Sequence, residues 1–437
     1  RNKEPATRKE NMKIINIVPG FGGTFYCGNC LRDSGFIKTL NSLGHDAMTL
    51  PIYLPLSVDN RQAETDVPVF YGAVNLYLKQ QFPFLRRMPK GMKNFFNSSW
   101  ILRYAAKKAG STRAKGLEEM TVSMLKGHEG YQKEELNQLV DFIASEQPDV
   151  VHLSNALLLG LAHKIKNELN IKVVCSLQDE DVWVDAMSNK YQDYVWKLMG
   201  YKAKDVDAFV AVSQYFADLM QTKMEIPNEK LHVVPIGVNP DHYKINEPNI
   251  EIPTIGYLSR RNKENGFEVL IDAFILLKKN SEFKQTRLKG TGGKTSDDKR
   301  FIKKQLKKLE KNNILEDVEF IENFKQENMN DFFKGLTVLS VPVLKGEAFG
   351  MYQLESLASG IPIVQPEIGA FPEIVKNTQG GVLFDPNYSR TLASKLEEVL
   401  SNTEALHIMS INGRKAVEEQ YNTNILTERM ISIYSKL

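Results

Sequence analysis

The sequence has few cysteines and lacks long hydrophobic runs. Three cysteines in 437 residues cannot form a disulfide scaffold and favour a reducing compartment, so we expect a cytoplasmic protein. No apolar run approaches the roughly 20 residues that a membrane-spanning helix needs. Residues 1–11 are polar and precede Met12. We therefore expect no signal peptide and treat residues 1–11 as a tail or an expression remnant.

Acidic residues are absent between positions 67 and 117, although the whole chain has a net charge of only +3. This stretch breaks the β/α pattern described below, and it predicts a mostly helical insertion over 73–130. Basic and aromatic residues mixed in this way suit a packed subdomain with a solvated face, an anionic membrane surface or an anionic acceptor. No RNA or DNA motif accompanies the charge, so we expect no nucleic-acid partner. The membrane alternative would make the protein peripheral at the inner face of a membrane through residues 79–115. The ten basic residues of the stretch are Lys79, Arg86, Arg87, Lys90, Lys93, Arg103, Lys107, Lys108, Arg113 and Lys115.

Strand-like and helix-like segments alternate along most of the chain, which predicts an α/β fold with parallel sheets. A polar segment rich in proline at 239–253 divides the pattern into two runs. We predict two doubly wound, Rossmann-like domains facing a cleft, over 12–245 and 246–420, and a last helix at 421–437 that crosses back to the first domain. The predicted strands are 13–18, 46–50, 149–153, 172–177, 207–212 and 231–234, then 253–258, 286–289, 318–321, 338–341 and 361–364.

The segment 346–355 carries the strongest site signal. It follows a predicted strand, so Glu347 lies on a loop at the carboxyl edge of the sheet and Glu355 lies in the following helix. Backbone amides of 349–351 open that helix and form an anion site. Two carboxylates beside such a site would repel phosphate, so we expect them to accept hydrogen bonds from sugar hydroxyls. The alternative is a βα turn with two solvated glutamates.

Two loops of the first half are further candidates. Gly22 and Gly23 belong to a glycine-rich loop after the first strand, where the backbone can approach phosphate closely. Gln178 and Asp179 follow another strand, where acidic residues also serve as ordinary helix caps. The triplet 179–181, like 205–207, matches an Asp-x-Asp metal signature, but two Rossmann-like domains disfavour the fold that uses it, and we expect no metal.

The pair Cys27 and Cys30 resembles a redox or zinc motif at first sight. The only other cysteine is Cys175, so four cysteine ligands for zinc are not available. We expect the pair to pack small side chains beside the cleft predicted between the two domains.

Together these motifs resemble family 4 of the retaining glycosyltransferases, which have the GT-B fold. The resemblance rests on the Glu-x7-Glu spacing of Glu347 and Glu355, followed by Ser-Gly-Ile-Pro-Ile-Val at 359–364 and Gly-Ala-Phe-Pro-Glu-Ile-Val at 369–375. It extends to the segments 20–23, 234–239 and 256–260.

The resemblance implies transfer of a sugar from a nucleotide diphosphate donor to a glycan, lipid or small-molecule hydroxyl, with retained anomeric configuration and no further cofactor. It assigns donor sugar hydroxyls to Glu347, the ribose to Glu355, and the leaving diphosphate to Arg260. The amides of Phe349, Gly350 and Met351 would contact the sugar and diphosphate, and Gly22 and Gly23 the donor from the opposite wall.

The sequence departs from the family pattern at two positions. Asn265 stands where the family has a second basic residue, which shifts that role to Lys263 or Arg261. Gln178 stands near the position of a family histidine and cannot titrate, while Asp179 can still orient the acceptor. These departures keep two rivals open: a nucleotide-sugar epimerase or phosphorylase of the same fold, and an inactive sugar-nucleotide-binding protein.

Overall fold

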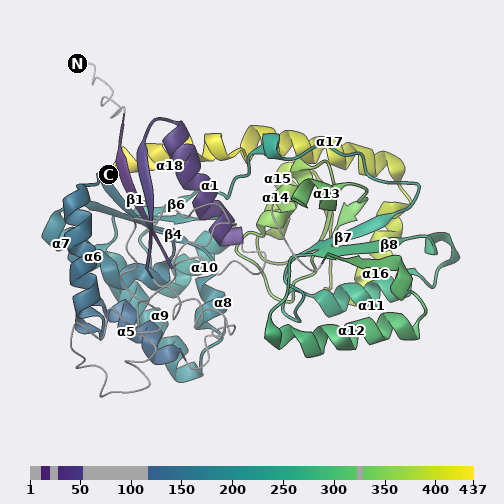
Figure 1. Cartoon of the computed structure of the whole chain (residues 1–437), viewed down its shortest axis with the longest axis horizontal. Helices are drawn as coiled ribbons and strands as arrows, with labels where there is room; N and C mark the ends of the chain where they lie inside the picture. The colour runs from purple at the N-terminus through teal and green to yellow at the C-terminus, as the bar shows by residue number, and fades with distance from the viewer. Residues whose placement is uncertain (1–10, 20–27, 53–116, 322–327) are drawn as a thin grey trace.

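The computed structural model describes residues 11–19, 28–52, 117–321 and 328–437, and these form two parallel six-stranded sheets flanked by helices (Figure 1). The first sheet has the order β2-β1-β3-β4-β5-β6 and the second the order β12-β11-β10-β7-β8-β9. The strands of the first sheet are β1 (Lys13–Val18), β2 (Asp46–Pro51), β3 (Val150–Leu153), β4 (Lys172–Leu177), β5 (Ala208–Ala211) and β6 (Leu231–Val233). Those of the second are β7 (Thr254–Leu258), β8 (Arg287–Thr291), β9 (Val318–Phe320), β10 (Val338–Leu339), β11 (Ile363–Pro366) and β12 (Gly381–Phe384).

Helices cover both faces of each sheet, which is why the central strands are short apolar runs without alternation. Every residue of β3, β5, β7 and β11 is buried. The helices of the first half are α1 (Gly28–Ser42), α5 (Glu118–Lys126), α6 (Lys133–Glu146), α7 (Ala162–Leu169), α8 (Glu180–Val184), α9 (Asn189–Lys202) and α10 (Gln214–Met224). Those of the second half are α11 (Phe267–Leu277), α12 (Lys299–Lys311), α13 (Met329–Phe333), α14 (Met351–Ala358), α15 (Phe371–Thr378), α16 (Ser389–Leu400), α17 (Thr403–Gln420) and α18 (Thr423–Tyr434).

Both sheets reverse their winding direction near the middle, between β1 and β3 in the first and between β7 and β10 in the second. Loops that leave the two adjacent strands at such a point diverge to opposite faces and open a crevice at the carboxyl edge of the sheet. The loops after β7 and β10 contain Arg260 and Glu347. The fold therefore places the two strongest candidates of the second half at one crevice.

The chain crosses between the two halves twice, and the two crossings lie against each other. The amide of Val238 donates to the carbonyl of Tyr421 at 3.0 Å, and the amide of Thr423 donates to the carbonyl of Val238 at 3.1 Å. A side chain on Gly237 would lie 2.9 Å from the Cα of Thr423, so this approach requires glycine. After the second crossing α18 packs on α1 of the first half, whereas α17 lies along the second half (Figure 1).

The predicted α/β architecture with two doubly wound sheets is confirmed. The strand β12 was not predicted, because it begins at the second of two glycines and carries too short an apolar run to show a period. Of the predicted insertion, residues 73–116 lie outside the described residues, whereas 117–130 contain α5 and a 3-10 turn at Gly127–Glu129. None of the described helices is both long and apolar enough to span a lipid bilayer.

Candidate active site

Glu347 lies on the loop that leads from β10 into α14, at the carboxyl edge of the second sheet. Gly350 precedes the helix with φ of 84°, a left-handed conformation that favours glycine. A Cβ at this position would lie 2.9 Å from a carboxylate oxygen of Glu347. The glycine thus lets the first turn of α14, with its outward-pointing amides, begin directly beside the carboxylate.

The carboxyl group of Glu347 is held by a neighbour on the helix and has a perturbed pKa. The hydroxyl of Tyr352 donates to Oε2 of Glu347 at 2.9 Å. Burial, and then the negative charge of Asp179, raise the pKa of Glu347 to about 8, and the tyrosine hydrogen bond opposes them. The ligand-free group is therefore mostly protonated at pH 7, and it can both donate and accept hydrogen bonds.

Asp179 belongs to the first half of the molecule, yet its charge acts on Glu347 of the second half. It follows β4 and begins α8 in a left-handed conformation with φ of 58°. A non-glycine residue with positive φ is uncommon and marks a locally constrained turn. The structure thus brings together two predicted site residues that are far apart in sequence.

Gln178 and Glu180 tie together the loops after β3 and β4. The side-chain amide of Gln178 donates to the carbonyl of Ser154 at 2.6 Å. The carboxylate of Glu180 accepts the backbone amides of Ala156 and Gln178, both at 2.7 Å. Burial raises the pKa of Glu180 to about 8, although these amide bonds lower it. Of the acidic residues 179–181, Glu180 is therefore buried and holds the loops after β3 and β4 together.

Glu355 lies about one turn into α14 and is fully buried. Tyr243, in the linker between the two halves, donates its hydroxyl to Oε1 of Glu355 at 2.9 Å. The carboxylate thus already accepts a neutral hydroxyl, the chemistry expected of it toward a ribose. This hydrogen bond ties Glu355 to the interdomain linker.

The other residues at the start of α14 turn their side chains into the protein. Phe349 and Met351 retain 3% and 7% of their surface exposed. The ring of Phe349 packs against Tyr421, with 6.2 Å between centroids. What this turn offers a ligand is therefore its backbone, as expected for residues predicted to bind through amides.

Arg260 follows β7 and has strong internal partners. Its guanidinium bonds the carboxylate of Asp298 at 2.8 and 3.0 Å and the hydroxyl of Thr295 at 2.8 Å. Burial alone would raise the pKa of Asp298, but the hydrogen bonds from Arg260 and Thr295 outweigh it and lower that pKa. The arginine is thus held in one orientation at the crevice, with its charge partly offset by Asp298.

Lys263 and Arg261, the two candidates for the second cation, differ in their exposure. Arg261 has no exposed surface, and its guanidinium lies 5.1 Å from the ring centroid of Phe320. Lys263 is exposed. Asn265, at the family's basic position, donates its side-chain amide to Ser259 at 2.6 Å and to the Arg260 carbonyl at 3.3 Å. Of the two replacements, only Lys263 has its side chain accessible to an anion.

Direct hydrogen bonds join the two halves at the start of α10. Ser213 donates its hydroxyl to the carbonyl of Ala348 at 2.7 Å, in the loop between β10 and α14. The carboxylate of Glu373, at the start of α15, accepts the amides of Gln214 at 2.9 Å and Tyr215 at 3.4 Å. A carboxylate at a helix N-terminus is stabilising. The structure therefore shows the two halves in contact beside the candidate site.

Several predictions lie outside the described residues. These are the glycines Gly22 and Gly23, the thiol of Cys27 and the basic segment 79–115. Cys30 lies in α1, where only its backbone is described, and Cys175 is buried in β4. Within the described ranges no group of three or more His, Cys, Asp or Glu side chains comes together to hold a metal ion.

Sequence reasoning missed the groups that hold the predicted residues in place. Tyr352, Tyr243 and Glu180 each bond a site residue or its loop. Only Tyr352 had a usable signal in the sequence. It lies five positions after Glu347, in the first turn of the helix that follows the Glu347 loop. The partnership of Tyr243 with Glu355 spans 112 positions and needs the folded linker.

The comparisons with known proteins agree with this geometry. Residues 122–242 match the model of glycosyltransferase family 4, and residues 240–416 match the model of glycosyl transferases group 1. The two matches together cover more than half of the chain. It therefore belongs to the family 4 glycosyltransferases of the GT-B fold.

Individual relatives are distant but extensive. The chain is 23% identical over 423 residues to an MMP alpha-(1->4)-mannosyltransferase of Mycolicibacterium hassiacum, covering 91% of this chain and 92% of the relative. It is 25% identical to an uncharacterised glycosyltransferase of Methanocaldococcus jannaschii, over 63% of this chain and 72% of that one.

Solved structures show the same fold at low identity. The sucrose-phosphate synthase of Thermosynechococcus elongatus superposes with a TM-score of 0.70 at 16% identity, covering 97% of this chain and 98% of the other. HepE of Anabaena in complex with UDP gives 0.68 at 14% identity, covering 98% of this chain and all of that one.

Proposed function

We propose that this protein is a retaining hexosyltransferase that moves a sugar from a nucleotide diphosphate donor to a hydroxyl of a glycan, lipid or small molecule. UDP-sugars are the first donors to test, because structural neighbours were solved with UDP and UDP-glucose. The donor binds mainly to the second half, and the acceptor binds mainly to the first.

The convergence of Glu347 and Asp179 carries this proposal. One carboxyl group comes from each half, and both lie where the start of α14 offers amides to an anion. A protonated Glu347 avoids a full negative charge beside a diphosphate and can still hydrogen-bond a donor hydroxyl. This arrangement is suited to a ligand that carries hydroxyls at one end and a diphosphate at the other.

In the proposed reaction the acceptor attacks the face from which the diphosphate leaves. The transition state has oxocarbenium character, as in other glycosyl transfers. The leaving phosphate oxygen takes the acceptor proton, which suits a wall where Gln178 cannot act as a base. Arg260, Lys263 and the helix amides stabilise the charge that develops on the diphosphate, and closure of the two halves limits hydrolysis.

The first experiment is a thermal-shift screen of UDP-, GDP- and ADP-sugars. We expect one nucleotide series to raise the melting temperature in a saturable way, and Glu355→Ala to weaken that response. Turnover with an acceptor panel then separates the rivals. Sugar interconversion without an acceptor would identify an epimerase, a phosphate-dependent reaction would identify a phosphorylase, and binding without turnover would identify an inactive sensor.

We also propose that transfer needs no metal and occurs in the cytoplasm, with the basic segment 79–115 able to hold the protein at the inner face of a membrane. Activity in EDTA equal to that in manganese supports the first point, and loss of activity that manganese restores contradicts it. Co-sedimentation with anionic liposomes that weakens with salt supports the membrane contact, and no binding at low salt rejects it.

A further inference from the structure

A cavity lies outside the residues assigned to the donor. It is lined by α1, α18, the linker after β6 and the first sheet, and its volume is about 460 Å³. Small-molecule sites typically measure about 300–1,000 Å³. Glu347, Asp179 and Arg260 do not line it, and its contact with the donor side is Met351. We call this space the hinge cavity, because both chain crossings contribute to its wall.

Three polar side chains form the floor of the hinge cavity. Asn16, His152 and Ser176 lie on β1, β3 and β4, on the sheet face that is otherwise covered by apolar residues of α1 and α18. Asn16 and His152 are direct partners in the parallel register. Ile14, Val150 and Val174 occupy the same face two positions earlier on the same three strands. The face therefore changes from apolar to polar toward the carboxyl ends of its strands.

His152 and Ser176 are hydrogen-bonded to each other, whereas Asn16 is not bonded to either of them. The ring of His152 bonds the hydroxyl of Tyr434 at 2.5 Å and that of Ser176 at 2.8 Å. Burial lowers the pKa of His152 to about 3, so the ring is neutral at physiological pH. Asn16 is 1% exposed, and within the described part of the chain neither polar atom of its side chain has a hydrogen-bond partner.

An unpaired amide in a protein interior is costly, by about 1–3 kcal/mol for each unsatisfied group. An apolar residue at position 16 would avoid this cost, as Ile14 does two positions earlier on the same face. The cavity gives Asn16 access to a ligand that supplies a hydrogen-bond donor and acceptor.

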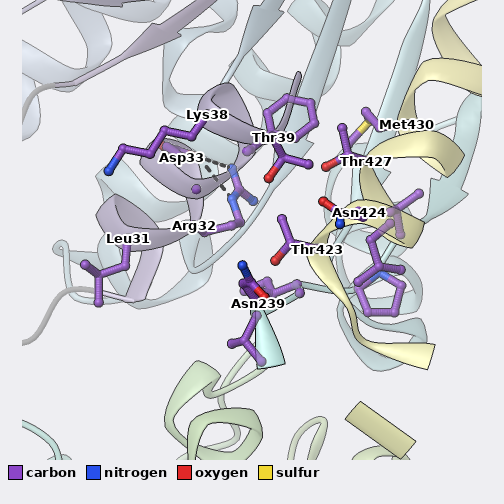
Figure 2. Close-up of a pocket in the computed structure, with 18 of the residues that line it drawn as sticks. Leu31, Arg32, Asp33, Lys38, Thr39, Asn239, Thr423, Asn424, Thr427 and Met430 are labelled. Atoms are coloured by element: carbon purple, nitrogen blue, oxygen red, sulfur yellow. Dashed lines mark hydrogen bonds and ion pairs between the residues drawn. The ribbon is translucent and has the colours of Figure 1, made fainter. Parts of the chain in front are cut away.

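The walls indicate what that ligand is. Figure 2 shows Arg32 projecting from α1 toward Thr423 and Asn424 of α18, with Thr427 further along the same helix. Arg32 bonds Asp33 at 2.6 Å, so the charges of this pair offset each other, and the further cation that lines the cavity, Lys38, is exposed to solvent. Hydroxyl and amide groups of α18 lie on the same helix as the apolar Met430, and Met351 adds apolar surface on the donor side. A polyhydroxylated molecule has both the hydroxyls and the C–H surfaces that match.

We propose that the hinge cavity is a second ligand site, separate from the donor cleft, for a small neutral polyhydroxylated molecule such as a polyol or a monosaccharide. Asn16 hydrogen-bonds the ligand through both atoms of its amide. Thr427 and Asn424 contact it from α18.

Methionine methyl groups provide the readout, because Met430 and Met351 both line the cavity. The full-length protein is labelled with [methyl-13C]methionine, the signals are assigned by single Met→Leu variants, and sorbitol is titrated without any sugar nucleotide. We expect a saturable shift of the Met430 signal, with Met351 following it. Met220, a buried residue of α10, is the internal control and should not move. This experiment does not measure sugar transfer. A negative result would therefore reject the hinge-cavity site but not the proposed transferase function, and an inactive transferase could still bind sorbitol here.

Two near-isosteric variants test the contacts. Asn16→Leu and Thr427→Val each remove hydrogen bonding with little change in shape, whereas Thr222→Val does the same on exposed α10 and is the matched control. We expect at least a tenfold weaker sorbitol response in Asn16→Leu, with a melting temperature equal to or above that of the wild type, and no change in Thr222→Val.

Three results would overturn the proposal. They are a Met430 signal that stays fixed up to high sorbitol concentration, an unchanged response in Asn16→Leu, and a shift confined to Met351, which would place sorbitol in the donor cleft. Tighter binding of gluconate than of sorbitol would contradict the neutral ligand.

Discussion

The two walls of the candidate cleft are built in different ways. The wall of the second half comes from one continuous segment, in which a strand, a glycine turn and a helix place Glu347, the amides and Glu355 in sequence order. The wall of the first half is assembled from separate loops after β3 and β4, joined by Gln178 and Glu180. The comparison shows why a short motif reveals a donor site, whereas the opposite wall becomes visible only in the folded chain.

Replacing Glu347 should have the largest effect. Glu347→Ala removes the group that we propose faces the donor sugar, and we expect turnover to fall by about 100-fold or more, as for other groups that act in the transition state. Glu347→Gln keeps a hydrogen-bonding group and should retain more activity. Steady-state kcat measures this, and a wild-type rate in Glu347→Ala would refute the site.

The same residue gives a test by pH. The folded protein raises the pKa of Glu347 from 4.5 to about 8, so the protonated form is favoured in the folded state. Its contribution to stability is complete below pH 4.5 and is lost as the pH rises through about 8. Glu347→Gln lacks this loss. Urea unfolding at pH 5, 7 and 9 measures the free energy of unfolding of both proteins. The difference between Glu347→Gln and wild type should move in favour of the variant as the pH rises. A difference that does not change with pH would contradict the raised pKa.

Changes in the wall of the first half should lower the stability of the protein. Glu180→Ala leaves the amides of Ala156 and Gln178 without their acceptor, and we expect the free energy of unfolding to fall by about 2 kcal/mol or more. Equilibrium urea unfolding measures the change. Asp181→Ala, one position on, serves as the control. Equal losses in both variants would show that Glu180 has no special role in joining the loops.

Glu355 should act mainly on donor binding. We expect Glu355→Ala to raise the donor KM about tenfold, an energy of about 1.4 kcal/mol, with a smaller change in kcat. Tyr243→Phe removes only the hydroxyl that Glu355 accepts, and its effect on KM should be a few-fold. An effect on kcat alone would assign Glu355 to the chemical step instead.

The smallest effect is expected where the halves touch. Glu373→Ala removes the carboxylate that accepts the first amides of α10, a capping interaction worth about 1 kcal/mol. We expect a rise of about fivefold in the donor KM without loss of fold. Glu367→Ala is a nearby control. If both variants behave like wild type, the contact does not support closure.

The sequence predicted the sheets well because parallel strands buried on both faces are apolar runs, and eleven of them were visible between helical periods. It located Glu347 because strand, turn and helix signals adjoin. It could not show that Arg260 is held by Asp298 or that Arg261 is buried, since both depend on how α12 and β9 pack. The polar floor with Asn16 was also invisible, because one asparagine in a short strand carries no period.

The most direct test of the central claim is the anomeric configuration of the product. Wild type and Glu347→Ala are incubated with the UDP-, GDP- or ADP-α-sugar that stabilises the protein and with an accepted hydroxyl compound, and the anomeric proton is followed by NMR. We predict an α-linked product from wild type and at least a hundredfold slower appearance in the variant. A β-linked product, or equal rates in both proteins, would contradict retaining transfer at Glu347.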